Sequence, residues 1–384
     1  MTKEETESGS GAVVDREAWN QFCEQLQHAG DAIWDTRLAR SEFDRAEGLR
    51  YLSRLLRAGL VSFVEATGPT RPLFRPMPDL VKMGLDNPDN YYLNASVNAR
   101  YDYRIRGNRR SIHYLSFAAQ NQNFAARDRI TGGAGHLNDA DLAFGPDGEF
   151  EILASQHPPS ESHRSQPESP PRNWLRLAPD TKQILVRQTY LHRAREQPVD
   201  VEIECLTQDP EPTILDPARI GGQLTGSALY AIGCARWFAD WVSGFEAAAP
   251  VNHFHLPDPE QHRFVGGDPN IVMWLGRWSL EPGEALVVDL QPPDCAYWNF
   301  QLGNVWAESL DSRFHRVHVN SGQAQTGADG GVRLVVSARE SRGPNWLETV
   351  GHDHGTMAVR WVRADSHPEP RCRVVPVAEL PDHA

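Results

Sequence analysis

The chain lacks the features that would place it in an oxidising compartment or in a membrane. Its five cysteines show neither CxxC spacing nor an even count, so a disulfide framework is not expected. No apolar run is long enough to span a bilayer. Residues 1–13 are polar, acidic and rich in Gly and Ser, which is typical of a disordered tail and unlike a signal peptide. We therefore expect a cytoplasmic protein.

An excess of positive charge is also absent. The 384 residues include 38 Lys and Arg against 51 Asp and Glu, which gives a net charge of -13. A surface that binds the nucleic-acid backbone, or an anionic membrane, needs the opposite sign. We therefore expect neither nucleic acid nor a membrane as a partner.

The motifs of nucleotide-dependent enzymes are missing as well. The chain has no Gly-x-Ser-x-Gly elbow, no Walker A loop and no dinucleotide fingerprint. Residues 131–135 are rich in glycine, but no helical pattern follows them to hold a phosphate. The sequence therefore requires no nucleotide or flavin cofactor.

What the chain does contain is a long internal repeat. Pro-Arg-Asn-Trp-Leu at 171–175 returns as Pro-Asn-Trp-Leu at 344–347. Upstream of each phrase the similarity continues, so that the copies span about 101–206 and 274–380. Such a repeat predicts two similar structural units.

Each copy has the pattern of antiparallel β-structure. Short runs rich in Val, Ile, Phe, Tyr and Trp are separated by Gly, Pro and Asn. Asp-Gly at 147–148 and at 329–330 predicts a type I′ hairpin turn in each copy. We predict a mainly β fold with helical additions, built from two tandem pseudo-symmetric β-sandwich or jelly-roll-like repeats, with N-terminal helices and a central helix between the repeats.

Helical patterns flank the copies. Hydrophobic residues recur at helical spacing from Asp15 to Ile33, and Ser41 to Asp44 resembles a capping box that starts a second helix. Ser227 to Glu246 is a third helical candidate. The chain would then divide into a disordered tail (1–14), a helical N-terminal region (15–70), a first repeat (71–213), a helical connector (214–270) and a second repeat (271–384).

Four motifs together resemble a known family. They are Ala-Glu-Gly-Leu-Arg-Tyr-Leu at 46–52, Asp-Asn-Pro-Asp-Asn at 86–90, the repeated Pro-x-Asn-Trp-Leu, and Gly-His-x-His-Gly-Thr-Met-x-x-Arg-Trp at 351–361. The set resembles bacterial proteins grouped under "domain of unknown function 1214". This resemblance implies a fold rich in β-structure and no settled activity. Such proteins are common in bacteria with broad catabolic repertoires, which favours small-molecule metabolism.

Comparison of the copies separates scaffold from candidate chemistry. Positions alike in both copies are interpreted first as scaffold: tryptophan would pack between sheets, asparagine would bond a turn, and arginine would pair with a carboxylate or stack on tryptophan. These positions are Asn173 and Asn345, Trp174 and Trp346, and Arg187 and Arg360. Reactive residues found in one copy only are the better functional candidates.

The copies differ most between Glu348 and Gly355. His352 and His354 are two residues apart, a spacing that points both rings to one face of an extended segment and suits metal ligation or acid-base catalysis. Glu348 could be a third ligand or a base, and Asp353 would orient or assist the histidines. The alternative is a polar turn whose histidines only bond nearby backbone.

A second His-x-His pair follows the predicted connector helix. His253 and His255 could lie against the second repeat and share the site of the first pair. Alternatively, Phe254 is the buried residue and both histidines face solvent. His113 and His136 have no partner at ligand spacing and are interpreted as structural.

Tryptophan is concentrated in the second copy. Residues of this kind would pack as core or would line an apolar pocket for a small molecule. We predict that substrate is bound by side chains of the second copy and of the segment before it, namely Trp346, Trp298, Trp306, Asn345, His253 and His255.

We predict a cytoplasmic enzyme that acts on a small, fairly apolar organic molecule by hydrolysis, elimination or isomerisation. His352 and His354 would be the acid and base or the ligands of a divalent metal, and Arg360 would hold an anionic or carbonyl group. The alternative is a non-catalytic binding module for a carbohydrate, a lipid or a protein. Self-association as a homo-oligomer is compatible with either.

Overall fold

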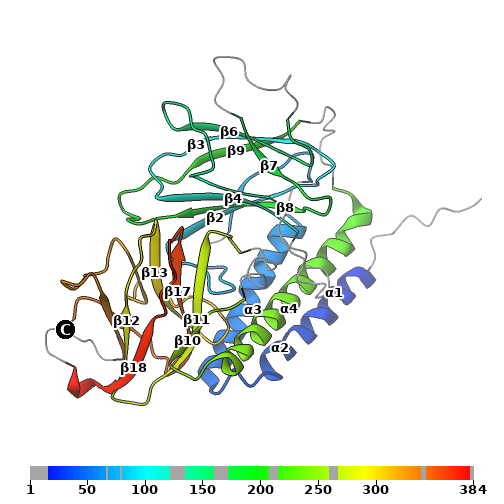
Figure 1. Ribbon diagram of the computed structural model, residues 1–384. Coiled ribbons are helices and arrows are strands. Elements are labelled where there is room, and N and C mark those ends of the chain that lie inside the picture. The colour runs from blue at the N-terminus through cyan, green and yellow to red at the C-terminus, as the bar shows by residue number, and fades with distance from the viewer. Residues whose placement is uncertain are drawn as a thin grey trace, which may run out of the picture.

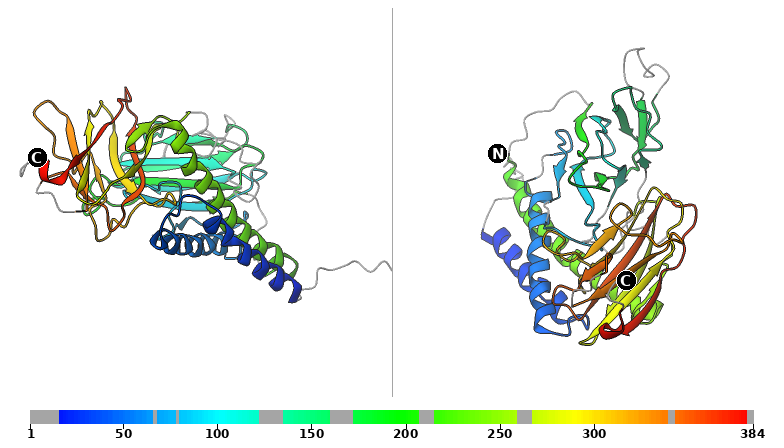
Figure 2. Two further views of the ribbon diagram at one scale, coloured as in Figure 1. Left: turned by 90° about the horizontal axis from the view of Figure 1, so that it is seen from below. Right: turned by 90° about the vertical axis from the view of Figure 1, so that its left-hand side faces the viewer.

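Two β-sandwiches and one layer of helices make up the computed structural model (Figure 1). The structure describes residues 16–65, 68–77, 80–121, 135–159, 172–206, 215–258, 267–338 and 343–380. The first sandwich is drawn in cyan and green, and the second in yellow to red. The helices lie together on one side of both, as Figure 2 shows from two further directions.

The first sandwich has a five-stranded sheet, ordered β1-β2-β8-β4-β5, and a four-stranded sheet, ordered β7-β6-β3-β9. Neighbouring strands pair antiparallel except β6 and β7, which are parallel. The strands are β1 (Arg75–Pro76), β2 (Asn90–Ser96), β3 (Tyr103–Asn108), β4 (Tyr114–Gln120), β5 (His136–Asn138), β6 (Glu149–Ser155), β7 (Arg172–Arg176), β8 (Gln183–Thr189) and β9 (Asp200–Cys205).

The second sandwich repeats this topology strand for strand. Its sheets are ordered β10-β11-β17-β13-β14 and β16-β15-β12-β18, again with one parallel pair, β15 and β16. The strands are β10 (His253–His255), β11 (Ile271–Ser279), β12 (Glu284–Leu290), β13 (Tyr297–Gly303), β14 (His318–Asn320), β15 (Val332–Ser337), β16 (Trp346–Glu348), β17 (His354–Val362) and β18 (Arg371–Pro376). The prediction of two tandem pseudo-symmetric sandwiches with helical additions is confirmed.

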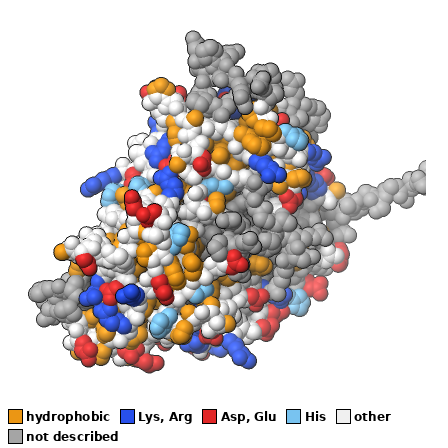
Figure 3. Space-filling model, viewed as in Figure 1, with side chains coloured by type: hydrophobic (Ala, Val, Ile, Leu, Met, Phe, Trp, Pro, Cys, Tyr) orange, Lys and Arg blue, Asp and Glu red, His pale blue; other side chains and the backbone are white. Residues whose placement is uncertain are grey.

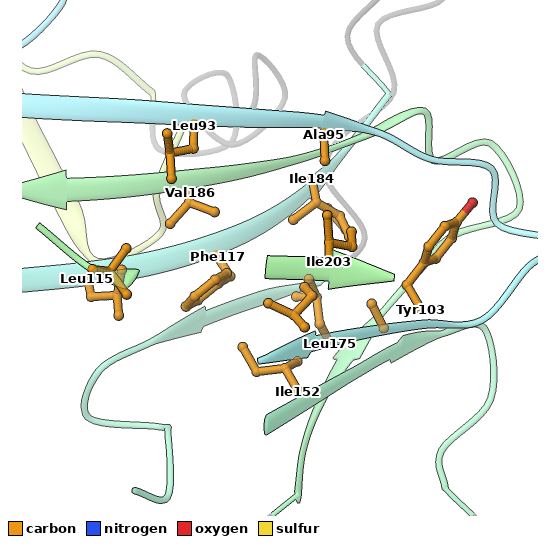
Figure 4. Close-up of a cluster of buried hydrophobic side chains, with 14 of the residues drawn as sticks. Leu93, Ala95, Tyr103, Leu115, Phe117, Ile152, Leu175, Ile184, Val186 and Ile203 are labelled. Carbon is orange, nitrogen blue, oxygen red and sulfur yellow. The ribbon is translucent and has the colours of Figure 1, made fainter. Parts of the chain in front are cut away.

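Alternating side chains fill the space between the two sheets of each sandwich. In β4, Leu115 and Phe117 point into the core and Tyr114 points away from it, because successive side chains of a strand face opposite sides. Figure 4 shows this core, in which Phe117 approaches Ile152 and Leu175 of the facing sheet. Full burial of each such side chain contributes roughly 1.5–3 kcal/mol to stability.

The helices are α1 (Arg16–Ala29), α2 (Asp31–Trp34), α3 (Glu42–Phe63) and α4 (Pro217–Ala248). The predicted capping box starts α3: Ser41 Oγ accepts the Asp44 N–H at 3.1 Å, and Asp44 Oδ2 accepts the Ser41 N–H at 2.8 Å. The predicted N-terminal helix is divided at Gly30 into α1 and α2, whereas α4 is longer than predicted. No helix among the described residues combines the length and hydropathy needed to cross a bilayer.

The two predicted Asp-Gly hairpins are wrong in detail. Gly148 and Gly330 have φ angles of 81° and 77°, but the aspartate before each is not left-handed. A type I′ turn needs positive φ at both central residues. Each turn leads into β6 or β15, while the strand before it, β5 or β14, belongs to the opposite sheet. The turns therefore follow a crossing between sheets and do not join paired strands.

Strands β4, β13 and β17 are buried along their whole length, on both faces. An antiparallel sheet commonly leaves one face to solvent. Here, Ala358 of β17 packs against α3 and α4, and Tyr297 of β13 meets Tyr114 of the first sandwich. The outer face of the five-stranded sheet of the second sandwich is therefore covered partly by helices and partly by the first sandwich.

Residues 82–89, which we call the strap, precede β2 of the first sandwich but lie on the second. Lys82 Nζ donates to the Ser309 carbonyl at 2.7 Å, and the Asp86 carboxylate accepts the Ser309 N–H at 2.9 Å. The Leu85 N–H donates to the Ala307 carbonyl at 2.7 Å. The strap thus ties the two sandwiches together through the segment between β13 and β14.

Candidate functional site

The predicted histidine pair of the second sandwich lies against the start of helix α3. His352 Nε2 is 2.9 Å from Glu47 Oε2, and His354 Nε2 is 3.4 Å from Asp44 Oδ2. All four side chains are at most 7% exposed. Burial lowers the pKa of His352, but the hydrogen bond and charge of Glu47 outweigh burial and the pKa is raised. Both rings therefore face one helix of the same chain.

The two carboxylates near these histidines point to different places. Asp353, with a side chain that is 80% exposed, contacts His354 Nδ1, and this bond holds the pKa of Asp353 below its ordinary value. Glu348 Oε2 lies 2.9 Å from Nδ1 of another histidine, His315. Within the described parts of the chain, no three His, Cys, Asp or Glu side chains are grouped so that they could hold a metal ion. Metal binding by His352 and His354 stays a prediction.

The two His-x-His pairs lie in different strands of one sheet. His253 pairs with Arg277 of β11, and β11 separates β10 from β17. Phe254 is buried, His253 is exposed, and His255 packs against the Phe245 ring with centroids 5.0 Å apart. Burial lowers the pKa of His255. The structure does not bring the two pairs together.

The predicted substrate-binding tryptophans are mostly core residues. Trp298 and Trp306 are 5% and 0% exposed. Trp306 Nε1 donates to the Asp44 carbonyl at 2.8 Å, which fixes the start of α3 on the second sandwich. Trp346 is partly buried and donates to Ser337 Oγ at 3.0 Å, just as Trp174 donates to Ser155 Oγ at 3.1 Å in the first sandwich.

Asn345 and Arg360 also serve the scaffold. Asn345 accepts the Gln325 N–H at 2.9 Å and donates back to the Gln325 carbonyl at 2.8 Å. Arg360 is buried and donates to the Leu85 carbonyl and to Gln301 Oε1, both neutral acceptors, in place of the predicted carboxylate or tryptophan partner. Burial lowers the pKa of this guanidinium. Its donors are therefore occupied by the strap and by β13.

An open pocket of about 440 Å³ lies on the segment that joins β13 to β14 and on β14 itself. Its lining includes the basic side chains His315, Arg316 and His318, and also Phe314, which is 78% exposed. No carboxylate among the described residues pairs with Arg316. The pocket therefore offers one unpaired guanidinium, two imidazoles and an aromatic ring.

Each imidazole of this pocket is held by a carboxylate. His315 Nδ1 lies 2.9 Å from Glu348 Oε2, and His318 Nε2 lies 3.1 Å from Asp89 Oδ1. The second pair is more deeply buried, with side chains that are 14% and 6% exposed, against 34% and 32% for the first. The pocket is thus lined by two histidines, each bonded to a carboxylate, and the two pairs differ in their exposure to solvent.

Asp89 is buried but remains an acid of low pKa. Burial raises its pKa, whereas bonds from His318, Tyr297 and Asn320 lower it, and the net shift is downward. Tyr297 donates to Oδ2 at 2.7 Å and Asn320 Nδ2 donates to the same oxygen at 3.0 Å. The other ring nitrogen of His318, Nδ1, has no hydrogen-bond partner in the described part of the structure. This nitrogen is buried and is the ring nitrogen that carries no hydrogen bond.

A second pocket, of about 680 Å³, lies between residues 31–38 and helix α4. It is lined by acidic and basic side chains together, including Arg277 paired with Glu246, and by none of the described histidines. The wider surface is similarly mixed: acidic, basic and apolar side chains are interspersed on the face shown in Figure 3. The pocket at His315 and His318 is therefore the better site for acid-base chemistry.

The sequence contained a signal for this site that the reasoning from spacing did not use. His-x-Asn occurs at 136–138 and 318–320, in equivalent strands of the two copies, and Asp89 and Asp268 each precede the second strand of a five-stranded sheet. The prediction from spacing interpreted His136 as structural because it has no partner at ligand spacing, and it did not pair His136 with His318. Of the predicted site residues, Glu348 contacts a histidine of this pocket, His315, although the prediction had placed it with His352 and His354.

Comparisons with known proteins agree with the fold. The model of a family described as protein of unknown function, DUF1214, matches residues 285–365. The crystal structure of an uncharacterized protein from Burkholderia cenocepacia is 39% identical, with a TM-score of 0.88, and the match covers 95% of this chain and 98% of that one. A protein from Vibrio parahaemolyticus is 11% identical, with a TM-score of 0.48, over 91% of this chain and 100% of that one. No curated protein matches the chain.

Proposed function

The chain belongs to the DUF1214 family of proteins of unknown function, and we propose that it binds a small organic anion in the pocket of His315, Arg316 and His318 and transfers protons there. One observation carries the proposal: both histidines of a single pocket are held by carboxylates, beside an arginine that has none. A carboxylate that orients an imidazole is the common support of a general base. A guanidinium fork suits a carboxylate ligand.

The roles follow from the environment of each side chain. Arg316 would hold the anionic group of the ligand, and the exposed ring of Phe314 would contact its apolar part. His318, the more deeply buried histidine, would take a proton from carbon, and His315 would deliver one to another carbon or to a leaving group. Two proton-transfer groups and an anion anchor favour isomerisation or elimination over hydrolysis, which needs an activated nucleophile as well.

This proposal moves the centre of the site from the predicted pair, His352 and His354, to His315 and His318. Glu348 belongs to both versions, since it begins the segment of His352 and His354 and also holds His315. His352 and His354 would then position helix α3, Arg360 would position the strap, and Asp353 would hold His354. The ligand class becomes more polar than predicted, because the pocket is basic and the tryptophans are buried.

Binding of organic acids tests the anion site. Benzoate and short aliphatic carboxylates would be titrated against the protein by calorimetry, and Arg316→Gln should weaken binding about tenfold or more, the size of a charge-assisted hydrogen bond. Arg333→Gln is the matched control, because Arg333 is paired with Asp289 at 2.6 Å and does not line the pocket. If no organic acid binds, or both variants weaken binding equally, the anion site is not at Arg316.

Proton transfer can be detected before the substrate is known. Bound acids would be incubated in D₂O, and loss of carbon-bound protons would be followed by NMR. His318→Gln and His315→Gln should abolish exchange, whereas His28→Gln, on an exposed helix end, should not. Specific binding without any exchange would contradict catalysis and favour the alternative of a non-catalytic binding module.

A further inference from the structure

We propose that Asp89, the last residue of the strap and directly before β2 of the first sandwich, is the positioning residue of His318 in the pocket. By accepting the Nε2–H of His318, Asp89 fixes the tautomer in which Nδ1 carries the free lone pair. The catalytic use of His318 rests on the proposed function, whereas the contact between Asp89 and His318 does not depend on it. This contact makes the site of the second sandwich dependent on a carboxylate supplied by the first.

The surroundings of Asp89 allow the carboxylate only one role. Oδ2 already accepts two hydrogen bonds, from Tyr297 at 2.7 Å and from Asn320 at 3.0 Å, which leaves Oδ1 to His318 at 3.1 Å. The Asp89 N–H donates to Asn87 Oδ1 at 3.0 Å, so the strap backbone is fixed as well. Donors surround both oxygens. An ionised carboxylate only accepts hydrogen bonds, so it favours the tautomer of His318 that carries its proton on Nε2. Rotation of the Asp89 side chain would break the bonds from Tyr297 and Asn320.

A second carboxylate crosses the interface between the sandwiches in the opposite direction. Asp268, which precedes β11 of the second sandwich, accepts at Oδ2 from Tyr114 and Ser116 of the first, both at 2.8 Å. His136 Nε2 lies 3.1 Å from Oδ1 of Asp268. Tyr114 and Tyr297 are equivalent residues of β4 and β13, and their rings meet at the interface. In each direction, one carboxylate thus accepts a hydrogen bond from a tyrosine of the other sandwich and lies 3.1 Å from a histidine of that sandwich.

This reciprocity provides a matched control within the same molecule. Asp89→Asn and Asp268→Asn each remove one buried charge from the interface, and they differ in whether the affected histidine is His318 or His136. An asparagine cannot replace Asp89, because its NH₂ group must face either His318 or the two donors at Oδ2. Damage to docking should be similar in both variants, whereas damage to the pocket should be confined to Asp89→Asn.

The decisive measurement is the tautomer of His318, read from long-range ¹H–¹⁵N correlations of the imidazole rings in the intact protein at a pH where they are neutral. His318→Gln assigns the signals. We expect the Nε2–H form in the wild type and in Asp268→Asn, and a mixture of tautomers in Asp89→Asn. Deuterium exchange into a bound acid should fall about 10²-fold or more in Asp89→Asn, the usual contribution of a base, and change little in Asp268→Asn.

Three results would overturn the inference: an Nδ1–H form of His318 in the wild type, an unchanged tautomer in Asp89→Asn, or equal disturbance by Asp268→Asn. The wild-type reading decides the matter even if Asp89→Asn fails to fold, and Tyr297→Phe then serves as a milder variant that keeps the carboxylate. If the tautomers behave as expected but benzoate neither binds nor exchanges, the proposed function fails and the positioning of His318 by Asp89 stands.

Discussion

The two sandwiches share one topology but differ in what covers their sheets. The strand order is the same in both, and the repeated Asn-Trp phrase makes the same hydrogen bonds in each. In the second sandwich the five-stranded sheet packs in one core with α3 and α4, and the segment between β13 and β14 lines the histidine pocket. No described strand residue of the first sandwich belongs to that core. The repeat therefore specifies the scaffold, and the elements added to it differ between the two sandwiches.

The largest expected effect tests the helical layer, which distinguishes the second sandwich. Arg54 of α3 is 2.6 Å from Glu308, whose side chain is 1% exposed. Arg54→Met leaves that carboxylate buried and unpaired, so the free energy of unfolding should fall by about 3–5 kcal/mol. Urea denaturation measures this loss, and the double variant Arg54→Met/Glu308→Gln should recover much of it. A loss without recovery would contradict an electrostatic cause.

The same variant has a predictable pH dependence. Burial raises the pKa of Glu308, and removal of Arg54 should raise it further, above the unfolded value of roughly 4.3. A carboxyl group whose pKa is raised by folding contributes stability that is present below the unfolded pKa and is lost as pH rises through the folded pKa. The loss in Arg54→Met should therefore be larger at pH 8 than at pH 5.

Next in size is a matched pair of core substitutions. Leu175 and Leu347 occupy equivalent positions in β7 and β16 and are both 0% exposed. Replacing either with alanine should cost about 2–5 kcal/mol through lost burial and the cavity left behind. Because the strap and the reciprocal carboxylates join the sandwiches, we expect both variants to shift one common unfolding transition. Two transitions, each moved by only one variant, would show that the sandwiches unfold independently.

A smaller and equal effect is expected at the repeated asparagines. Asn173 accepts the Ala143 N–H at 2.8 Å and donates to the Glu151 carbonyl at 3.1 Å, as Asn345 does with Gln325 and Arg333. Asn173→Ala and Asn345→Ala should each cost about 1–3 kcal/mol, because buried backbone groups lose their partners. Thermal denaturation of both variants checks this. A loss at one position only would mean that the copies have different roles there.

The smallest effect is expected from Trp174→Phe and Trp346→Phe. Each substitution keeps an aromatic ring and removes the bond to Ser155 or Ser337, at a cost of about 0.5–1.5 kcal/mol. Ligand titration sharpens the comparison, since neither variant should change binding of organic acids. Weaker binding in Trp346→Phe alone would return Trp346 to the substrate site that the sequence predicted.

The fold was accessible from the sequence because a duplication supplies its own internal alignment. Pairing of the Asn-Trp phrases and of the Asp-Gly turns gave the correct equivalence of the two copies, and the runs of Val, Ile, Phe, Tyr and Trp indicated β-strands. The division of the N-terminal helix at Gly30 was not predicted, because the hydrophobic spacing continues through this residue. Periodicity records which face is buried and not whether the backbone continues unbroken.

The site was less accessible because its residues come together only in the tertiary structure. Asp89 and His318 are 229 positions apart and belong to different sandwiches. Similarly, nothing in the spacing of His352 and His354 indicates that Glu47 and Asp44 of a distant helix are their partners. Local patterns locate reactive side chains, but the choice between ion pair, catalytic pair and scaffold depends on which segment packs against them.

The two carboxylates that cross the interface in opposite directions suggest how such a chain arose. Asp89 lies 3.1 Å from His318 and Asp268 lies 3.1 Å from His136, so the two carboxylates face histidines in opposite directions across the interface. A single ancestral sandwich would make both contacts by pairing with a second copy of itself across a twofold axis, as an isologous homodimer does. Gene fusion would then turn an interface between subunits into an interface within one chain. Afterwards the two halves would be free to diverge while both carboxylates stayed in the interface.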